Sequence, residues 1–438
     1  MTAERAQTTF HVTERYRQYV VWLLCAVYLF NHVDRQILAI LVQPIKAEFD
    51  LSDAQLGLVG GLAFALFYST LGIPIARLAD RSSRTNIIAA SLALWSLFTA
   101  LTGLARNFYH LLLARVIVGV GEAGCSPPAY SLIGDYFEPK RRATAIAIYS
   151  LGVSGGAIVG LLIGSAVAEA HGWRTAFFVL GVPGIVLAAI VKLTLREPPR
   201  GWADGTPAPA RIAPVSEVFR ALWAKHTFRA ISIAAALHAF VAYGVAGFYS
   251  AFLIRSHDMG LAQTGRWLAF ASIVGGLAGT FLGGKLTDVL TARHNDARWA
   301  QWIPTLTLTI NLPIGIALFL TPHVDAVIVL LTVNIALGST FLAPTVASIQ
   351  RLVSAHERAL AAALLLFILN LIGLGLGPIV TGLLSDALNE HFLTRGANAD
   401  EASADGLRFS MLTMLAANLF SAIFYWRAAR TFREESIS

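Results

Sequence analysis

Twelve apolar runs, each long enough to cross a lipid bilayer, constrain this chain more than any other feature of its sequence. A hydrocarbon core about 30 Å thick is spanned by about 20 helical residues. Within that core every backbone polar group must be satisfied internally, which favours helices. The expected spans are 19–42, 55–79, 86–105, 109–134, 143–168, 174–195, 228–254, 264–290, 301–320, 324–350, 357–385 and 407–427.

The spans predict an all-α membrane protein of twelve transmembrane helices in two six-helix halves. Residues 1–195 form the N-terminal half, 196–227 a cytoplasmic linker with one or two surface helices, and 228–438 the C-terminal half. The composition agrees, because 56% of the 438 residues are hydrophobic and 13% are charged, whereas soluble domains carry about 25% charged residues. Cys25 and Cys125 lack the spacing of metal ligands, so we expect buried thiols, no metal and no cofactor.

Lysine and arginine are distributed unevenly between the two ends of the spans. With the N-terminus inside, about 24 of the 33 fall on the cytoplasmic side, as the positive-inside rule requires. Both termini are therefore expected in the cytoplasm. The excess positive charge faces the membrane surface, so nucleic acid is not an expected partner. The Ala-rich sequence and compact loops suggest a bacterial inner (plasma) membrane protein, expected to be a monomer.

A short cytoplasmic motif occurs at equivalent places in both halves. Ala76 precedes Asp80 by four residues, with Arg81 and Arg84 beyond, and Gly284 precedes Asp288 in the same way. The repeat indicates an internal duplication, and it resembles the loop signature of the major facilitator superfamily. That resemblance implies halves that rock around a midplane site. Asp80, Arg81, Arg84 and Asp288 are then candidates for a conformational gate, and the alternative is a static turn.

Glycine recurs every four residues in two spans, at 152–164 and at 275–283. Such stripes of small residues let helix backbones approach closely in lipid, so we expect two packing seams. A third cluster, Gly373, Gly375, Gly377 and Pro378, predicts a weak point where the eleventh span can bend.

Four charged residues lie near the middle of the membrane, all in the first half: Asp34, Arg35, Arg115 and Glu122. Each costs about 2.5–3.5 kcal/mol on insertion scales, so each is a functional hypothesis. Asp34 and Arg115 lie at similar depth, which allows an ion pair. We predict that Asp34 and Glu122 couple transport to protons and that Arg115 tunes them. Arg35 is predicted to contact a substrate head group or to snorkel, and a static ion pair is the alternative reading.

Neutral polar residues within spans are candidates for contacts to a substrate: Asn31, His32, His238, Tyr243, Asn334 and Asn370. For the two histidines, a hydrogen-bonded packing role is the competing interpretation. The second half carries no acid or base near the midplane. Its side of a central cavity is therefore expected to be mostly apolar, with aromatic residues such as Phe240, Phe248, Tyr249, Phe341 and Phe367.

Three sequence runs resemble the spinster family of lipid transporters: Asn31-His32-Val33-Asp34-Arg35, Gly119-Val120-Gly121-Glu122-Ala123 and Arg196-Glu197-Pro198-Pro199-Arg200-Gly201. The resemblance implies a zwitterionic or phosphate-bearing lipid substrate of lysophospholipid or sphingolipid type, exchanged for protons. Proton-coupled organic-anion symporters of the same superfamily also have an Asp-Arg pair in the first span and a Gly-Glu-Ala run in the fourth, so such a symporter stays an alternative. A membrane hydrolase using Ser126 near Glu122 is disfavoured, since no Ser/His/Asp set converges along the helix faces. We therefore expect a secondary active transporter and not an enzyme.

Overall fold

The structure, a computed structural model, describes residues 10–203, 215–354 and 357–435. Twelve helical segments in this part of the chain are long and apolar enough to cross a membrane, so the predicted all-helical fold is confirmed. The helices of the first half are α2 (Glu14–Phe49), α3 (Asp53–Gly57), η1 (Leu58–Leu62), α4 (Ala63–Arg81), α5 (Arg84–Thr102), α6 (Phe108–Glu122), α7 (Ser126–Tyr136), α8 (Pro139–His171) and α9 (Trp173–Thr194).

The second half begins with α10 (Val215–Ala224), a short helix outside the spans, which agrees with the expected linker helix. Residues 204–214 of the linker lie outside the described part of the chain. The spans follow as α11 (His226–Ala246), α12 (Tyr249–His257), α13 (Leu261–His294), α14 (Trp299–Leu320), α15 (Val324–Ser339), α16 (Leu342–Gln350), α17 (Arg358–Leu369), η2 (Asn370–Leu376), α18 (Gly377–Thr394), α19 (Ala399–Met414) and α20 (Ala416–Glu435).

The chain divides into two compact units whose boundary does not follow the sequence halves. Unit 1 comprises residues 1–41 and 66–212, and unit 2 comprises 42–65 and 213–438. The end of α2, all of α3 and η1, and the start of α4 therefore pack with the helices of the second half.

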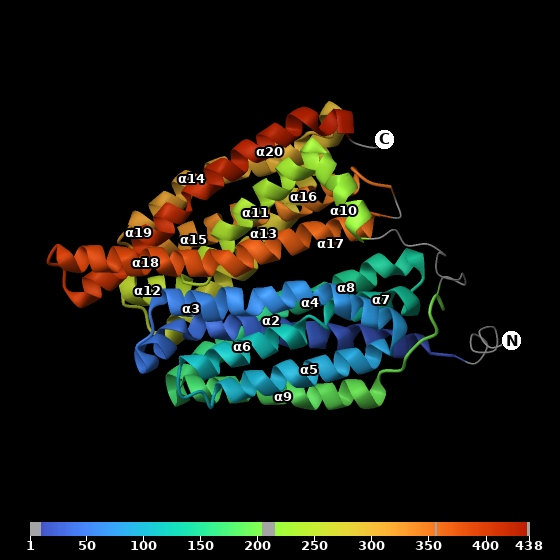
Figure 1. Cartoon of the computed structure of the whole chain (residues 1–438), viewed down its shortest axis with the longest axis horizontal. Helices are drawn as coiled ribbons and strands as arrows, with labels where there is room; N and C mark the ends of the chain where they lie inside the picture. Colours follow the sequence, from blue (N-terminus) through green and yellow to red (C-terminus); the bar gives the residue numbers. More distant parts are fainter. Residues whose placement is uncertain (1–9, 204–214, 355–356, 436–438) are drawn as a thin grey trace. The chain divides into compact units, whose positions relative to one another are not determined.

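Within unit 1, the predicted glycine stripe of the fifth span is a packing seam. A Cβ added at Gly152 would lie 2.7 Å from the Cys25 carbonyl oxygen, and one at Gly156 would lie 2.5 Å from that of Leu29. Since both contacts are to backbone atoms of α2, only glycine allows this approach of α8 to α2. On another side of the unit, α5 and α9 run side by side (Figure 1).

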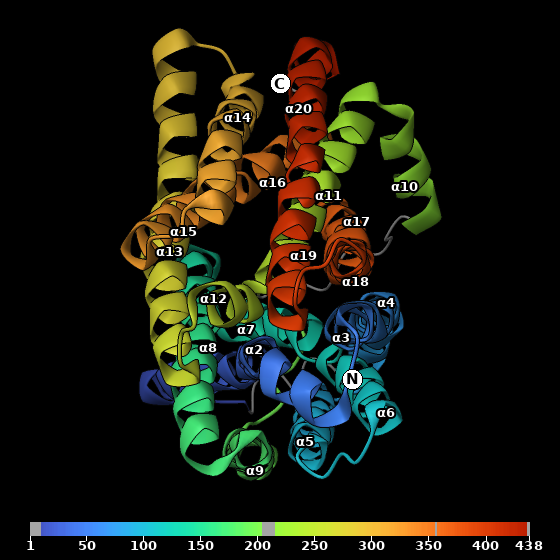
Figure 2. The same ribbon diagram turned by 90° about the vertical axis from the view of Figure 1, so that its left-hand side faces the viewer.

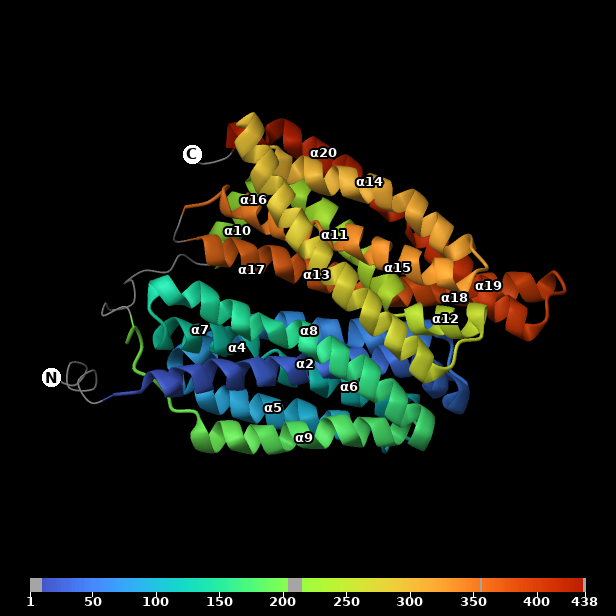
Figure 3. The same cartoon turned by 180° about the vertical axis from the view of Figure 1, so that it is seen from behind.

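Unit 2 contains the second seam, where α13 crosses α15 (Figure 3). Added Cβ atoms at Gly275 and Gly279 would lie 2.5 Å and 2.0 Å from the carbonyl oxygens of Thr332 and Ala336. The amphipathic helix α10 packs beside α11 (Figure 2) and buries Val218 and Leu222 in an apolar core. Both stripes therefore hold neighbouring helices of one unit together.

Two π-helical segments, η1 and η2, face each other in unit 2. The segment η2 coincides with the run of glycines that predicted a weak point in the eleventh span. An added Cβ at Gly61 of η1 would lie 2.9 Å from the Leu374 carbonyl oxygen of η2. The neighbouring helices α3 and α18 also approach closely at glycine, since an added Cβ would lie 2.2 Å from the Pro378 carbonyl oxygen at Gly57, and 2.2 Å from that of Asp53 at Gly382.

Several predicted spans begin or end at other residues than the observed helices. The first span extends over Glu14–Phe49 and the twelfth over Ala399–Glu435, because polar residues continue each helix beyond the apolar core. In contrast, the seventh ends at Ala246, and the separate helix α12 takes up the expected remainder.

Candidate transport site

Asp34 forms a buried ion pair with Arg115 inside unit 1. Arg115 Nη1 on α6 donates to Asp34 Oδ2 on α2 at 3.1 Å, and both side chains are about 3% exposed. The Thr99 hydroxyl on α5 lies 2.5 Å from Asp34 Oδ1. Both carboxylate oxygens of Asp34 therefore have partners, and the pair that the depth calculation allowed is present.

Glu122, at the C-terminal end of α6, forms a second pair with Arg35. Arg35 Nε donates to Glu122 Oε2 at 2.9 Å, and Asn31 Nδ2 donates to the same oxygen at 2.9 Å. The other oxygen, Glu122 Oε1, is buried without a hydrogen-bond partner among the described residues. Arg35 therefore pairs with a carboxylate within the unit instead of snorkelling, and its predicted contact with a substrate head group stays a prediction.

A cluster of tyrosines surrounds this second pair. The Arg35 guanidinium lies 4.5 Å from the centre of the Tyr68 ring, Tyr28 stacks on Tyr149 at 4.4 Å, and Tyr130 meets Tyr149 edge-on at 5.3 Å. Tyr130 is 44% exposed, so the cluster opens to one side of the unit. These tyrosines, which lie on α2, α4, α7 and α8, were not predicted as site residues.

His32 belongs to the same region, since its ring contacts Tyr28 edge-on at 4.6 Å. Its Nδ1 lies 3.2 Å from the Tyr28 carbonyl oxygen, one helical turn earlier. This bond fixes the ring against its own helix, as a packing histidine requires. Its predicted contact with a substrate stays a prediction.

Unit 2 has a polar core of its own, built from neutral groups. Asn334 Nδ2 donates to Asn311 Oδ1 at 3.0 Å, and the Tyr249 hydroxyl donates to Asn334 Oδ1 at 3.1 Å. The two ring nitrogens of His238 lie 2.9 Å from Asn418 Oδ1 and 3.0 Å from the Gly338 carbonyl oxygen. Asn311 and Asn418 were missed by sequence reasoning, because a single amide in an apolar run gives no sign of its partner.

The expectation that the second half presents a mostly apolar side to a central cavity stays a prediction. Within unit 2, two hydrogen-bonded groups, Asn311–Asn334–Tyr249 and His238–Asn418, lie among apolar side chains, and Phe248 and Tyr249 are buried. Of the remaining predicted contacts, Tyr243 is 40% exposed, and Asn370 begins the π-helical segment η2.

At the predicted cytoplasmic end, only one of the four gate candidates is part of a network. Arg84 is buried and donates to Asp135, to Glu197 Oε1 at 2.6 Å and to the Pro198 carbonyl oxygen at 2.9 Å. Burial opposes ionisation of Glu197, but hydrogen bonds from the Thr85 backbone and from Arg84 outweigh it and hold the pKa of Glu197 below its ordinary value. This network fastens the start of the linker to unit 1.

The other three gate candidates, Asp80, Arg81 and Asp288, are exposed and make no hydrogen bond or ion pair within the described ranges. Their predicted exchange of partners stays a prediction.

A charged cluster at the predicted external end was missed. Asp53, the first residue of α3, accepts two hydrogen bonds from Arg255 on α12 at 2.7 and 2.8 Å, and one from Lys46 at 2.5 Å. The backbone amides of Asp53 and Ala54 donate to Asp386 on α18, each at 2.8 Å. The sequence Ser52–Gln55 indicates only a capping box, which is indeed present. The long-range partners had no sequence signal.

Across the described residues, no three His, Cys, Asp or Glu side chains are arranged to hold a metal ion.

The comparisons with known proteins agree with this geometry. Residues 24–322 match the family model of the Major Facilitator Superfamily. An MFS-type efflux pump of Mycolicibacterium smegmatis is 33% identical over 419 residues, 95% of this chain and 94% of the relative. Protein spinster homolog 3 of Danio rerio is 27% identical over 407 residues, 89% of this chain and 80% of the relative.

Among solved structures, a bacterial homolog of the human lysosomal transporter spinster, in an inward-facing and unoccupied conformation, superimposes with a TM-score of 0.89. It is 36% identical, and the match covers 98% of this chain and 100% of that one. Twelve membrane-spanning helices, the paired charges of α2 and α6, and these matches lead to one conclusion. The chain is an integral membrane transporter of the major facilitator superfamily, similar to the spinster proteins.

Proposed function

We propose that this protein is a proton-coupled secondary active transporter that moves an amphipathic, lipid-like substrate of lysophospholipid or sphingolipid type by alternating access. One observation carries the proposal. Glu122 is a buried carboxylate with one oxygen held by Arg35 and Asn31 and the other oxygen unpartnered, beside a cluster of tyrosines.

The unpartnered oxygen is the reason to assign the proton to Glu122 rather than to Asp34. A buried ionised carboxylate with an unsatisfied oxygen is costly, and a proton on that oxygen removes the buried charge. Asp34 has Arg115 and Thr99 on its two oxygens, so it gains less from protonation. Arg115 then holds Asp34 ionised, while Glu122 gains and loses the proton.

The surroundings of Glu122 favour a substrate whose head group carries an amine. Tyrosine rings beside a carboxylate bind ammonium groups through cation–π attraction and charge. An amine that pairs with Glu122 competes with the proton for the same carboxylate, which produces exchange of substrate for protons. The efflux activity in the name of the Mycolicibacterium relative is consistent with export.

Alternating access requires contacts that form in one state and break in another. We assign this role at the external end to the Asp53–Arg255 cluster, since residues 42–65 belong to the first half in sequence and pack within unit 2. In a state open to the outside, residues 1–195 move as one half and these bonds break. At the cytoplasmic end, Asp80, Arg81 and Asp288 become available to replace them, and Arg84 keeps the linker in place.

The organic-anion symporter predicts the opposite linkage. An anionic head group pairs with Arg35, and Arg35 is released when Glu122 is protonated. Proton and anion then help each other to bind, and binding of each raises the affinity for the other by the same factor. The two functions are therefore distinguished by the sign of a single pH dependence.

The test is binding to the purified protein between pH 5 and pH 8, with lysophosphatidylcholine and glucuronate as the probes. We expect the lysolipid affinity to fall as the pH falls, by up to about tenfold per pH unit, and to be independent of pH in Glu122→Gln. Glucuronate affinity that rises as the pH falls, with no lysolipid binding, would establish the symporter instead.

Transport in proteoliposomes with an imposed pH gradient completes the test. In the wild type, the imposed proton gradient should drive the lysolipid in the direction opposite to proton movement. In Glu122→Gln, the lysolipid should still exchange across the membrane, but its transport should not respond to the gradient. His238→Gln is the matched control, because it replaces a buried ionisable group of the other unit. Unchanged gradient dependence in Glu122→Gln would disprove the coupling role.

The remaining expectations belong to the same proposal. The protein works as a monomer in a bacterial inner membrane, with both termini in the cytoplasm and protons and bilayer lipid as its other partners. The test of orientation is cysteine labelling of an external position such as Asn398 against a cytoplasmic one such as Ser82.

A further inference from the structure

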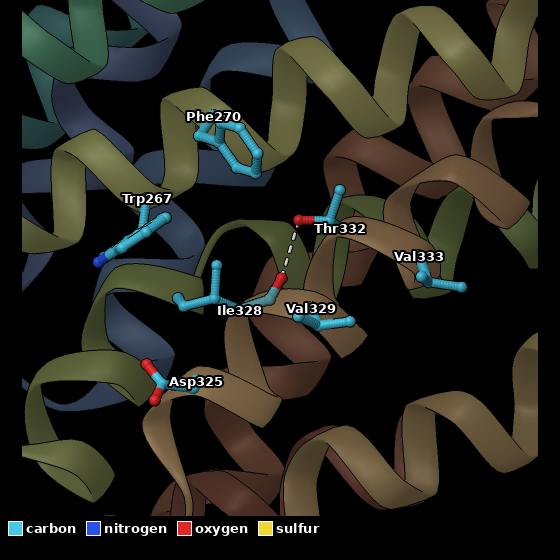
Figure 4. Close-up of a pocket in the computed structure, with 7 residues that line it drawn as sticks. All are labelled: Trp267, Phe270, Asp325, Ile328, Val329, Thr332 and Val333. Carbon is cyan, nitrogen blue, oxygen red and sulfur yellow. Dashed lines mark hydrogen bonds between the residues drawn. The ribbon is translucent and has the colours of Figure 1, made fainter.

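An open groove of about 340 Å³ lies between α13 and α15 in unit 2. Its walls are Trp267 and Phe270 on one helix and Ile328, Val329, Thr332 and Val333 on the other, with Asp325 at one end (Figure 4). None of the residues that line it belongs to the ion pairs of unit 1 or to the hydrogen-bonded amides of unit 2.

The groove is apolar except at its end. Thr332 is the other polar group in the wall, and its hydroxyl donates to the Ile328 carbonyl oxygen at 2.8 Å, as the dashed line in Figure 4 shows. Asp325 is exposed and makes no hydrogen bond or ion pair within the described residues. The groove therefore has one uncompensated negative charge at one end and is apolar along most of its length.

The positions of the groove residues along their helices match the depths of a lipid head group and of its acyl chain. Asp325 lies in the first turn of α15, at the end of a membrane span. Val333 lies eight residues further on, which is about 12 Å deeper at 1.5 Å per residue. A head group at the level of Asp325 thus places its chain along Val329 and Val333, inside the hydrocarbon region.

The side of the groove is open to the bilayer, because Val329 is 62% and Phe270 47% exposed on membrane-spanning helices. The occupant therefore enters from the surrounding lipid. Trp267 and Asp325 lie at the same end of the groove (Figure 4). An indole face and a carboxylate together are suited to an ammonium group.

We propose that this groove binds a phospholipid of the bilayer whose head group carries an amine, such as phosphatidylethanolamine. The ammonium group pairs with Asp325 and lies against Trp267, and one acyl chain fills the part of the groove between Phe270 and Val333. By the charge distribution, the lipid belongs to the external leaflet. The site is independent of the proposed transport function.

Native mass spectrometry of the full-length protein with phosphatidylethanolamine or phosphatidylglycerol of identical acyl chains tests this. We expect the ethanolamine lipid to be retained preferentially, and Asp325→Asn to lower its apparent affinity about tenfold, which is about 1.4 kcal/mol. The matched control is Asp400→Asn, since Asp400 is also an exposed acid in the first turn of a predicted external helix, α19. It should retain the preference.

Two further variants separate the alternatives. Val329→Trp fills the groove and should abolish retention of the ethanolamine lipid, whereas Glu122→Gln should leave it unchanged. Equal retention of both lipids by the wild type, or an undiminished preference in Asp325→Asn, would overturn the proposal. So would a change of oligomeric state in Val329→Trp, which would show that the groove is covered by a second copy of the chain.

Discussion

The two units solve the same problem, polar groups inside a membrane protein, in different ways. Unit 1 buries two ion pairs, Asp34–Arg115 and Arg35–Glu122. Unit 2 also buries the Asp53–Arg255 pair at its end, but its interior polar groups are neutral: Asn334 bonds Asn311 and Tyr249, and His238 bonds Asn418. The carboxylates of unit 1 can take up a proton and change the net charge of its core, whereas the asparagine amides of unit 2 cannot.

This difference separates two jobs that every coupled transporter performs. Unit 1 can respond to a proton at Glu122, which has one buried carboxylate oxygen without a hydrogen-bond partner among the described residues, whereas Arg115 holds Asp34 ionised. Unit 2 provides a fixed hydrogen-bonded frame, since His238 has both ring nitrogens occupied by protein groups. Coupling energy is therefore expected to originate in unit 1 and to be transmitted by packing.

The largest effect on stability is expected from breaking one pair of unit 1. Arg115→Met leaves the Asp34 carboxylate buried without its cation, and removal of one partner of a buried pair costs about 3–5 kcal/mol. The free energy of unfolding, from denaturant titration of the solubilised protein, measures the loss. The double variant Arg115→Met/Asp34→Asn should recover much of it. A double variant as unstable as the single one would show that the guanidinium matters for packing and not for charge.

A smaller loss, equal in the two units, is expected from filling the glycine seams. Gly156→Ala and Gly279→Ala place a Cβ 2.5 Å and 2.0 Å from a backbone oxygen, and such overpacking costs about 1–3 kcal/mol. Gly72→Ala and Gly276→Ala are the controls, because an added Cβ meets nothing within 4 Å there. The same titration should show them neutral or up to about 1 kcal/mol more stable. Equal losses in seam and control variants would contradict the close approach.

The neutral core of unit 2 should respond more weakly than the charged core of unit 1. Asn311→Ala leaves the Asn334 amide without its acceptor, at a cost of about 1–3 kcal/mol, and Tyr249→Phe removes one hydrogen bond worth about 0.5–1.5 kcal/mol. Proteoliposome transport by both variants should keep its dependence on the pH gradient. A lost dependence in either would place part of the coupling in unit 2.

The fold was largely predictable from the sequence, and the pairing within the site was only partly so. The free-energy cost of placing polar groups in lipid acts on each segment separately. It therefore leaves a local signal in the sequence, as long apolar runs and as the uneven distribution of lysine and arginine. Glycine periodicity predicted both seams for the same reason. The pairing of Asp34 with Arg115 could be foreseen as possible, because both residues lie on regular helical spans and their positions along those spans place them at similar depth in the membrane.

Pairings that depend on how helices rotate about their axes were not predictable. Arg35 and Asn31 both reach Glu122 because of the side of α2 that faces α6, a relation between helices with no local signature. The same applies to Asp53 with Arg255, whose residues lie about 200 positions apart. From sequence alone, a charged residue near a helix end is indistinguishable from an ordinary helix cap, because its partner on another helix is not known.

The smallest effect is expected at Glu197, and it tests whether pH acts on the core or on the rim of unit 1. Its folded pKa lies below the ordinary value of about 4.3, so its contribution to stability is fully present above that pH and disappears as the pH falls through the folded pKa. Because Arg84 also retains Asp135, Glu197→Gln should cost less than about 1 kcal/mol at pH 7. The stability difference between wild type and this variant should be constant from pH 5 to pH 8 and vanish in stronger acid. Glu14→Gln, at the exposed Arg141–Glu14 pair, is the control and should differ little from wild type at any pH. A difference that already declines between pH 7 and pH 5 would mean that the linker network titrates in the range of transport, and the pH dependence of transport could then no longer be assigned to Glu122 alone.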